Sequence, residues 1–406
     1  MAGRWRIAGL IMAGIGLTCG TMAHAGSEKP RNPADEAVYK DRFAAFLKDP
    51  GNFPYAPMEP LKGARHYRVL PNATAAKSGI RAATLETARA YAESNRSTAF
   101  LVWHKGKIAA RWYGSGVTAQ TPLVSKSLAK PLTAIAMGRA IALGKIKSLD
   151  QPLAEIMPEL VGKPKGRILV RHLLDMRSGM LDQGFSADPE HPLNRCYIGL
   201  DHGDCIINDY PMISEPGRRY AYANAPSDMV ALVIERATGT RYGDFIAREV
   251  LGKIGAQGGE IWVNRPGGLA HSGCCTLLPA ETWLRMAVLL VEDGLWNGAR
   301  LLPKGYVAEM RKGTPQNPNF GLGVWIGEPY KPRRGFGAPG APGPQVLHSE
   351  PYLDPEMFLF DGNANQTIHI SPRHKLIVLR MGPTPPAQPE WDNATLPNLL
   401  IRGLKK

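Results

Sequence analysis

The chain has 406 residues, of which 49 are lysine or arginine and 35 are aspartate or glutamate, so its formal net charge is +14. Hydrophobic residues make up 44% and charged residues 21%, which is ordinary for a globular protein and excludes simple disorder. The 44 glycines and 35 prolines follow no three-residue period, which excludes collagen. The basic residues are scattered rather than clustered, so we expect no nucleic-acid partner.

The first 25 residues have the pattern of a secretory signal peptide. Arg4 and Arg6 precede a mostly apolar stretch at 7–19, and Ala23-His24-Ala25 matches a signal-peptidase site. The apolar stretch is short for a membrane span, and no later stretch reaches that length. We therefore predict cleavage after Ala25, no stable membrane span afterwards, and a periplasmic or secreted location.

Export places four cysteines in an oxidising compartment. Cys196 and Cys205 enclose only eight residues, so they can form a local disulfide, whereas adjacent cysteines such as Cys274 and Cys275 rarely bond each other. One of the adjacent pair can instead join Cys196 or Cys205, and the sequence does not choose between these pairings. We expect at least one disulfide that involves Cys196 or Cys205. The chain has no CxxC or HxH pattern, so we expect no metal and no cofactor.

The first part of the predicted body is a helix followed by a hairpin. Residues 26–80 are rich in proline and weakly patterned, so we expect them to wrap around the body. The patterns predict a helix over 84–94, a strand over 99–103 and a returning strand over 108–113. A further helix follows Ser127, where apolar side chains share one face.

The middle of the chain has the pattern of short helices and loops. A helix is predicted over 226–238, with a proline near its start and Gly239 just after its end. Another helix is predicted over 279–293. Residues 327–357 form an insertion that is rich in proline and glycine.

The C-terminal part returns to strands. Alternating apolar residues at 367–370 and 376–380 predict a hairpin, and 396–404 predicts a closing helix. Strands at both ends of the chain with helices between them indicate an α+β fold, in which an antiparallel sheet is flanked by helices and carries an inserted all-helical subdomain. The predicted sheet domain comprises 81–145 and 266–406, and the predicted helical subdomain comprises 146–265.

Ser127-Leu128-Ala129-Lys130 is the only place where serine precedes lysine by three residues. At helical spacing the two side chains share a face, and the positive end of a helix favours negative charge on the serine. A serine hydroxyl becomes a good nucleophile when a base removes its proton. A lysine that burial keeps uncharged can be that base.

Tyr222-Ala223-Asn224 is the only Tyr-x-Asn sequence and lies just before the helix predicted at 226. A tyrosine next to two cationic groups can have a lowered pKa and relay a proton. The amide of Asn224 can form a hydrogen bond with a substrate carbonyl. Tyr222 and Asn224 are therefore further candidates for the site.

Taken in order, these motifs resemble the serine β-lactamase-related superfamily, which contains class C β-lactamases, D-Ala-D-Ala carboxypeptidases, esterases and 6-aminohexanoate-dimer hydrolases. The resemblance runs from about residue 98 to 382. It implies a sheet domain and a helical subdomain with the active site between them. It also implies an acyl-enzyme on Ser127, proton transfer shared by Lys130 and Tyr222, and a positioning role for Asn224. The other matching segments are 171–174, 178–179, 216–217, 319–325 and the final hairpin.

One motif departs from the family's pattern. The place of the third motif, a lysine or histidine two residues before a glycine on an inner strand, is held by Asn363-Ala364-Asn365-Gln366. We take Asn363, Asn365 and Gln366 as substrate-binding candidates, with the Gln366 N–H beside that of Ser127 as an oxyanion donor. His271-Ser272-Gly273 has fitting letters but precedes the helix at 279–293, so we exclude it from the site.

Loss of that cation predicts weaker binding of substrates that carry a carboxylate next to the scissile bond. Arg333 or Arg334 in the insertion can restore a cation if the insertion folds over the cleft. We expect both arginines to be solvated loop residues instead.

The resemblance therefore implies an exported serine hydrolase that cleaves a small ester or amide, most similar in pattern to 6-aminohexanoate-dimer hydrolases and esterases. One alternative is a β-lactamase or D-Ala-D-Ala carboxypeptidase that acts on cell-wall peptides. Another is a catalytically inactive protein that binds cell-wall fragments, and the presence of Ser127, Lys130 and Tyr222 argues against it. The sequence does not specify the oligomeric state.

Overall fold

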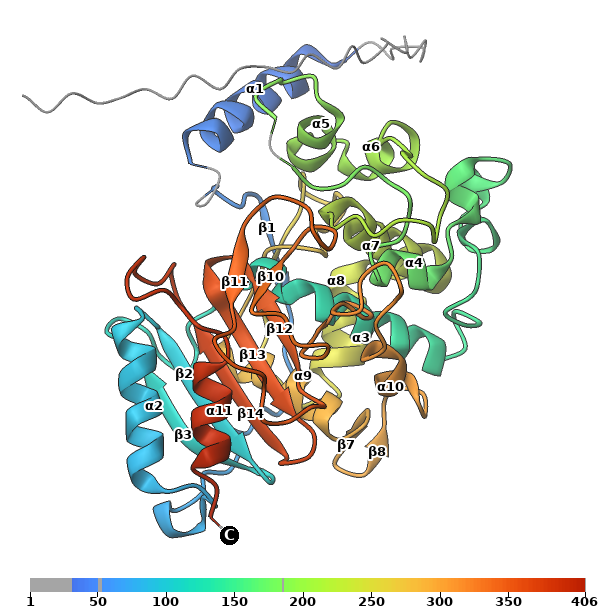
Figure 1. Cartoon of the computed structure of the whole chain (residues 1–406). Helices are drawn as coiled ribbons and strands as arrows, with labels where there is room; N and C mark the ends of the chain where they lie inside the picture. The colour runs from blue at the N-terminus through green and yellow to red at the C-terminus, as the bar shows by residue number, and fades with distance from the viewer. Residues whose placement is uncertain (1–30, 50–52, 185, 406) are drawn as a thin grey trace, which may run out of the picture.

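The structure is a computed structural model that describes residues 31–49, 53–184 and 186–405. The predicted signal peptide, residues 1–25, lies outside the described residues. The body is built on a six-stranded antiparallel sheet (Figure 1). In spatial order its strands are β3 (Lys107–Tyr113), β2 (Ala99–His104), β14 (Leu376–Met381), β13 (Gln366–Ser371), β12 (Phe358–Gly362) and β9 (Trp325–Ile326).

Helices cover both faces of this sheet (Figure 1). Successive strand residues point to opposite faces, so Phe100 and Val102 of β2 pack on one side and Leu101 packs on the other. The first side is covered by α2 (Ala82–Ser94) and α11 (Thr395–Arg402). The second side is covered by α9 (Ala280–Val291), which is buried along its whole length.

A second antiparallel sheet joins segments that are far apart in the sequence. Its strands are, in spatial order, β1 (Met58–Leu61), β5 (Gly259–Trp262), β6 (Thr276–Leu278) and β4 (Leu123–Val124). β4 leads through the 3-10 turn η3 (Lys126–Leu128) into α3 (Ala129–Ala142). The sheet therefore anchors the turn that carries Ser127.

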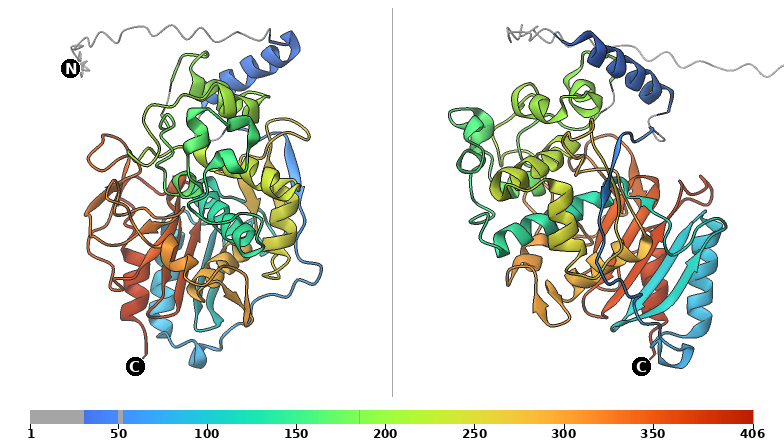
Figure 2. Two further views of the ribbon diagram at one scale, coloured as in Figure 1. Left: turned by 90° about the vertical axis from the view of Figure 1, so that its right-hand side faces the viewer. Right: turned by 180° about the vertical axis from the view of Figure 1, so that it is seen from behind.

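Most helices lie between the strands in the chain and form a layer on one side of the sheet. They are α4 (Val170–Leu174), α5 (Pro192–Ile198), α6 (His202–Asn208), α7 (Asn224–Thr238) and α8 (Tyr242–Phe245), which continues into the π-helical turn η7 (Ile246–Leu251). α1 (Pro33–Lys48) contacts α5 at the end of the molecule opposite the C terminus (Figure 2).

The remaining elements are short. They are α10 (Tyr306–Met310), the ribbon of β7 (Leu295–Trp296) and β8 (Ala299–Arg300), the ribbon of β10 (Arg333–Gly335) and β11 (Gln345–Leu347), and the 3-10 turns η2 (Ala75–Lys77), η4 (Leu153–Glu155), η5 (Pro158–Leu160), η6 (Pro164–Arg167) and η8 (Asn363–Asn365). Within the described ranges, no helix combines the length and the apolar character that a membrane span requires.

The predicted α+β class, with an antiparallel sheet flanked by helices, is confirmed. The helix predicted from 226 begins at Asn224 and ends at Thr238, where Gly239 adopts a positive φ of 65°. The range 146–265, predicted to be wholly helical, also contains β5, and the segment 26–80, predicted to wrap around the body, supplies α1 and β1. Both strands pair with distant segments, so no local pattern revealed them.

Candidate active site

Ser127 lies at the centre of η3, half-buried, where β4 turns into α3. Gly362, the last residue of β12, lies against this turn. A Cβ atom at Gly362 would lie 3.2 Å from the backbone nitrogen of Ser127 and 3.0 Å from the carbonyl oxygen of Ser125. Glycine at this position therefore lets the end of β12 approach the backbone N–H of Ser127 closely.

Lys130 follows Ser127 by one helical turn and is buried. Its Nζ donates hydrogen bonds to Asn224 Oδ1 at 2.7 Å and to the carbonyl oxygen of Gly273 at 3.0 Å, and it lies 3.3 Å from Ser127 Oγ. Burial lowers the pKa of Lys130 to about 7, although the negative charge of Asp228 opposes this shift. A substantial fraction of Lys130 is therefore an uncharged amine at neutral pH.

The two carbonyl oxygens determine where the lone pair of that amine points. The oxygens of Asn224 and Gly273 can only accept hydrogen bonds, so each takes one N–H of Lys130. An uncharged amine has two N–H bonds, and both are then used. Its lone pair is directed at the third contact, the hydroxyl of Ser127, which is the geometry that a base needs.

Tyr222 lies over Lys130, with the amine 4.8 Å from the ring centroid, and stacks on Trp325. The expected lowering of its pKa is wrong: burial raises the pKa of Tyr222, and the Ser127 hydroxyl and the Arg334 charge offset only part of the rise. Its hydroxyl is buried and forms no hydrogen bond of normal geometry among the described residues, although the Ser127 hydroxyl is close enough to lower its pKa. Tyr222 is therefore protonated at neutral pH and suited to donate a proton rather than to remove one.

The segment that replaces the family's third motif forms η8, between β12 and β13. The side chain of Gln366 donates to the carbonyl oxygen of Val124 at 2.8 Å and so ties β13 to β4. Arg380 donates to the carbonyl oxygen of Asn365 at 3.2 Å. Asn363 and Gln366 line a cleft of about 740 Å³ beside η3. The other candidate site residues are not among its lining residues, namely Asn365, Ser127, Lys130, Tyr222 and Asn224.

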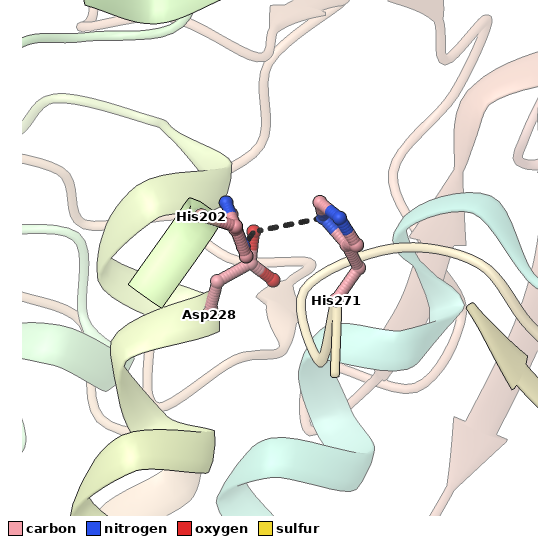
Figure 3. Close-up of side chains that lie close together, drawn as sticks. All are labelled: His202, Asp228 and His271. Carbon is pink, nitrogen blue, oxygen red and sulfur yellow. Dashed lines mark ion pairs between the residues drawn. The ribbon is translucent and has the colours of Figure 1, made fainter. Parts of the chain in front are cut away.

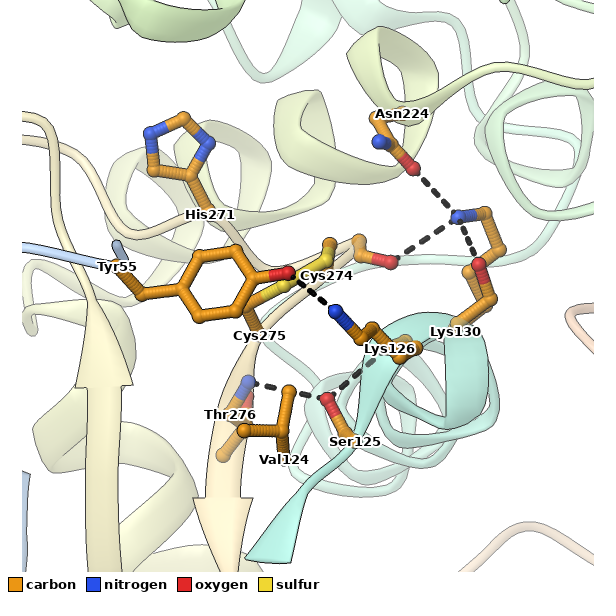
Figure 4. Close-up of a disulfide and its surroundings, with 12 residues drawn as sticks. Tyr55, Val124, Ser125, Lys126, Lys130, Asn224, His271, Cys274, Cys275 and Thr276 are labelled. Atoms are coloured by element: carbon orange, nitrogen blue, oxygen red, sulfur yellow. Dashed lines mark hydrogen bonds between the residues drawn. A yellow bond between two sulfur atoms is a disulfide. The ribbon is translucent and has the colours of Figure 1, made fainter. Parts of the chain in front are cut away.

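The charged residues that line this cleft, Lys126 and Arg96, are both basic. Lys126 precedes Ser127 and donates a hydrogen bond to the hydroxyl of Tyr55 at 2.8 Å (Figure 4). A cation therefore lies at the edge of the site, although Asn363 stands where the family carries one.

The insertion at 327–357 packs against the site. The ring of Phe336 meets that of Tyr222 edge-on, with the centroids 6.2 Å apart, and its carbonyl oxygen accepts a hydrogen bond from Tyr220 at 3.3 Å. The insertion therefore contacts the ring of Tyr222 directly.

The two arginines of this insertion have different surroundings. Arg333 is exposed and pairs with Glu390, as expected for a solvated residue. For Arg334 the expectation is wrong, because its side chain is buried, pairs with Asp361 and lies 3.9 Å over the ring of Trp325. The two residues follow each other in β10, so their side chains point to opposite sides.

A buried cluster that the sequence did not indicate lies behind Lys130. Asp228 of α7, one turn after Asn224, accepts a hydrogen bond from the N–H of Gly273 at 2.7 Å. His202 Nε2 and His271 Nδ1 lie 3.3 and 3.7 Å from its second oxygen (Figure 3). Burial alone would raise the pKa of Asp228, but the two histidines lower it. The spacing between Asn224 and Asp228 on one helix face was the only local sign of this arrangement.

Two histidines and a carboxylate are a donor set that zinc can bind, and their ligand atoms all lie within 4.8 Å of one another. However, the rings of His202 and His271 are stacked, with centroids 4.0 Å apart and an interplanar angle of 23°. Nitrogen lone pairs lie in the ring planes, so two nearly parallel rings cannot both direct them at one ion. The arrangement therefore does not fit a metal site.

The loop that begins with His271-Ser272-Gly273, which we excluded as the third motif, lies directly behind the base. It approaches Lys130 from the connection between β5 and β6 rather than from the inner strand, so it does not take the place of that motif. Its next residues, Cys274 and Cys275, form a disulfide, contrary to our expectation (Figure 4). Cys275 adopts a positive φ of 72° in this turn. The N–H of Thr276 then donates to Ser125 Oγ at 3.1 Å.

The second disulfide joins Cys196 of α5 to Cys205 of α6, which confirms the predicted involvement of these two residues. The carbonyl oxygen of Cys196 also contacts Nδ1 of His202. This disulfide therefore holds together the two helices that lie next to the buried cluster.

Comparisons with known proteins identify the family and the fold of the chain. The pattern that defines the Beta-lactamase family matches residues 82–393. A 6-aminohexanoate-dimer hydrolase of Paenarthrobacter ureafaciens is 26% identical over 234 residues, a match that covers 54% of this chain and 58% of that protein. The chain therefore spans less than two thirds of the length of this relative.

Two solved structures have the same fold. One, from Bacillus anthracis and provisionally assigned as a 6-aminohexanoate-dimer hydrolase, has a TM-score of 0.65 and 16% identity, and the match covers 88% of this chain and 91% of that one. The other is a family VIII carboxylesterase with a TM-score of 0.59 and 15% identity, and the match covers 80% of this chain and 99% of that one. At these identities the similarity concerns the fold alone.

Proposed function

The chain belongs to the beta-lactamase family, and from this premise we propose that it is a serine hydrolase that cleaves small esters or amides through an acyl-enzyme on Ser127. One observation carries the proposal. The amine of Lys130 is buried, has both N–H groups engaged by acceptors, and lies 3.3 Å from the hydroxyl of Ser127. An inactive binding protein has no need for such an arrangement.

In the acylation step, uncharged Lys130 takes the proton of Ser127 while Oγ forms a bond to the substrate carbonyl carbon. The carbonyl electron pair moves to oxygen and then returns to expel the leaving group. The leaving alcohol or amine takes a proton from Tyr222, and Lys130 returns its proton to the tyrosine. In deacylation, water attacks the same carbon, its proton passes to the base, and Ser127 leaves with a proton as the acid is released.

The negative charge on the carbonyl oxygen requires hydrogen-bond donors. We assign this role to the backbone N–H groups of Ser127 and Gln366. Gly362 contacts the turn of Ser127 and is paired in register with Gln366, and these two contacts support the assignment. Asn224 and Asn363 are the proposed polar contacts for the substrate.

We propose a substrate with a small acyl group, and an export route that leads to the periplasm or the medium. Two disulfides support an oxidising location. The relation to a 6-aminohexanoate-dimer hydrolase supports ester or amide bonds as targets.

The test combines covalent labelling with a substrate comparison. A fluorophosphonate probe should label the protein, and the Ser127→Ala variant should remain unlabelled. Short-chain nitrophenyl esters should be hydrolysed at least about tenfold better than a chromogenic cephalosporin, because Asn363 replaces the cation that receives its carboxylate. If labelling persisted in Ser127→Ala, the nucleophile would be wrong. If the cephalosporin matched the esters, Lys126 or Arg96 would supply the missing cation and β-lactamase would be the better assignment.

A further inference from the structure

The base and a buried carboxylate are joined through a single residue, Gly273. Asp228 accepts the N–H of Gly273 at 2.7 Å, and the carbonyl oxygen of Gly273 accepts an N–H of Lys130 at 3.0 Å. Asp228 itself is fully buried, one helical turn after Asn224, which contacts the same amine. Helix α7 therefore holds Lys130 by two routes, one direct and one through the Gly273 loop.

The carboxylate is itself held on its other side. His202 of α6 and His271 lie 3.3 and 3.7 Å from Asp228 Oδ2. The ring of His271 lies between that of His202, at 4.0 Å, and that of Trp262, at 3.5 Å. This packing holds the carboxylate in one place within the interior.

We propose that Asp228 is a positioning residue for the catalytic lysine: it binds the N–H of Gly273 and so fixes the residue whose carbonyl oxygen orients Lys130, and it places a buried negative charge behind the amine. The inference rests on the proposed function, because it treats Lys130 as the base. It adds a residue that the family motifs do not contain and a role for the loop at 271–273.

The charge has a predictable effect on Lys130. Removing a buried negative charge disfavours the ammonium form, so the pKa of Lys130 should fall further below its ordinary value. The pH range over which ester kcat/KM rises as Lys130 loses its proton would then move to lower pH. The other titratable or charged groups around this amine, from the elements packed against it, are Ser127, Tyr222, His202, His271, Tyr197 and, through Tyr222, Arg334 and Asp361.

The experiment measures the titration of Lys130 directly, so it does not depend on any substrate. Lysine side chains are labelled with ¹³C, the Lys130 signal is assigned by its absence in Lys130→Met, and its shift is followed with pH. Asp228→Asn keeps an oxygen for the N–H of Gly273 but removes the charge, and should lower the titration midpoint by about one pH unit. Asp228→Glu should restore most of the shift.

The matched control is Asp354→Asn. Asp354 is also fully buried and accepts hydrogen bonds from Ser371 Oγ and the N–H of Glu356, but it lies at the end of β13 away from Gln366. This variant should leave the midpoint of Lys130 unchanged. An unchanged midpoint in folded Asp228→Asn would overturn the inference.

A second variant keeps the test decisive if Asp228→Asn does not fold. A Cβ atom at Gly273 would lie 2.5 Å from Ser227 Cβ and 3.2 Å from Asp228 Oδ1, so Gly273→Ala must push the loop away from α7. Ester kcat should fall at least about tenfold with little change in KM, because Gly273 contacts the base and is not one of the proposed substrate contacts. Full kcat in this variant would overturn the proposal, as would stoichiometric zinc in the purified wild-type protein.

Absence of ester and amide turnover in the wild type would instead contradict the proposed function. The titration of Lys130 does not depend on that function, so the two failures can be told apart.

Discussion

The amine of Lys130 lies 3.3 Å from the hydroxyl of Ser127, and burial lowers the pKa of that amine to about 7. Only the uncharged amine can accept the proton, and its fraction rises as the pH increases through this value. We therefore expect kcat/KM for a neutral nitrophenyl ester to rise about tenfold per pH unit below about pH 6 and to level off above about pH 8. A pH–rate profile of the free enzyme measures this.

Lys130→Arg provides the control for that profile. Arginine keeps the positive charge at every accessible pH and cannot act as a base, so the variant should be inactive throughout. A wild-type profile that stays flat between about pH 5 and 9 would show that Lys130 is not the titrating base.

The hydroxyl of Tyr222 is predicted to protonate the leaving group. Tyr222→Phe keeps the ring that stacks on Trp325 and removes only a hydroxyl that forms no hydrogen bond of normal geometry among the described residues, so the fold should be unaffected. Ester kcat should fall by about 100-fold for a poor leaving group and by much less for nitrophenolate, which leaves without a proton. Tyr220→Phe, whose hydroxyl binds the carbonyl oxygen of Phe336 instead, should show neither effect. Equal losses with both leaving groups would refute the assigned role.

Much of the fold and three site residues could be predicted because their patterns are local. The helical pattern of α2, the apolar runs of β2 and β14 and the glycine after α7 each depend on neighbouring residues. Ser127 and Lys130 are one turn apart, so their spacing alone places them on one face. Asn224 was found because it follows a tyrosine in a family motif.

The parts that could not be predicted depend on contacts between distant segments. Asp228, His202 and His271 come from two helices and a loop, and no spacing in the sequence connects them. Arg334 belongs to a segment with loop composition. Its burial and its ion pair with Asp361 depend on a strand that is distant in sequence. Burial raises the pKa of Tyr222, and the rings that pack against it, Trp325 and Phe336, come from distant segments of the chain.

The ion pair of Arg334 and Asp361 is buried and leads to a stability prediction. Arg334→Met should leave the carboxylate without its main partner and reduce the free energy of unfolding by about 3–5 kcal/mol, measured by urea denaturation at pH 7. Burial raises the pKa of Asp361 and the arginine opposes that rise, so the variant should raise it further. A group whose pKa is raised on folding stabilises the fold at low pH and loses this contribution as the pH rises. The deficit of the variant should therefore shrink on acidification, and a deficit independent of pH would contradict the interpretation.

The two disulfides should differ in what their removal costs. The Cys196–Cys205 bond closes a loop across nine positions and so restricts the conformations of the unfolded chain. Replacing both residues by alanine should therefore reduce the free energy of unfolding by about 2–3 kcal/mol. Ester kcat should be nearly retained. The Cys274–Cys275 bond joins adjacent residues and restricts the unfolded chain very little. It directly follows Gly273, however, whose carbonyl oxygen holds Lys130. Its double alanine variant should therefore lose kcat severalfold while its urea midpoint changes less than that of the first variant. Urea denaturation and ester kinetics on both double variants measure this contrast, and the reverse pattern would show that the loop at 273–275 does not hold the base.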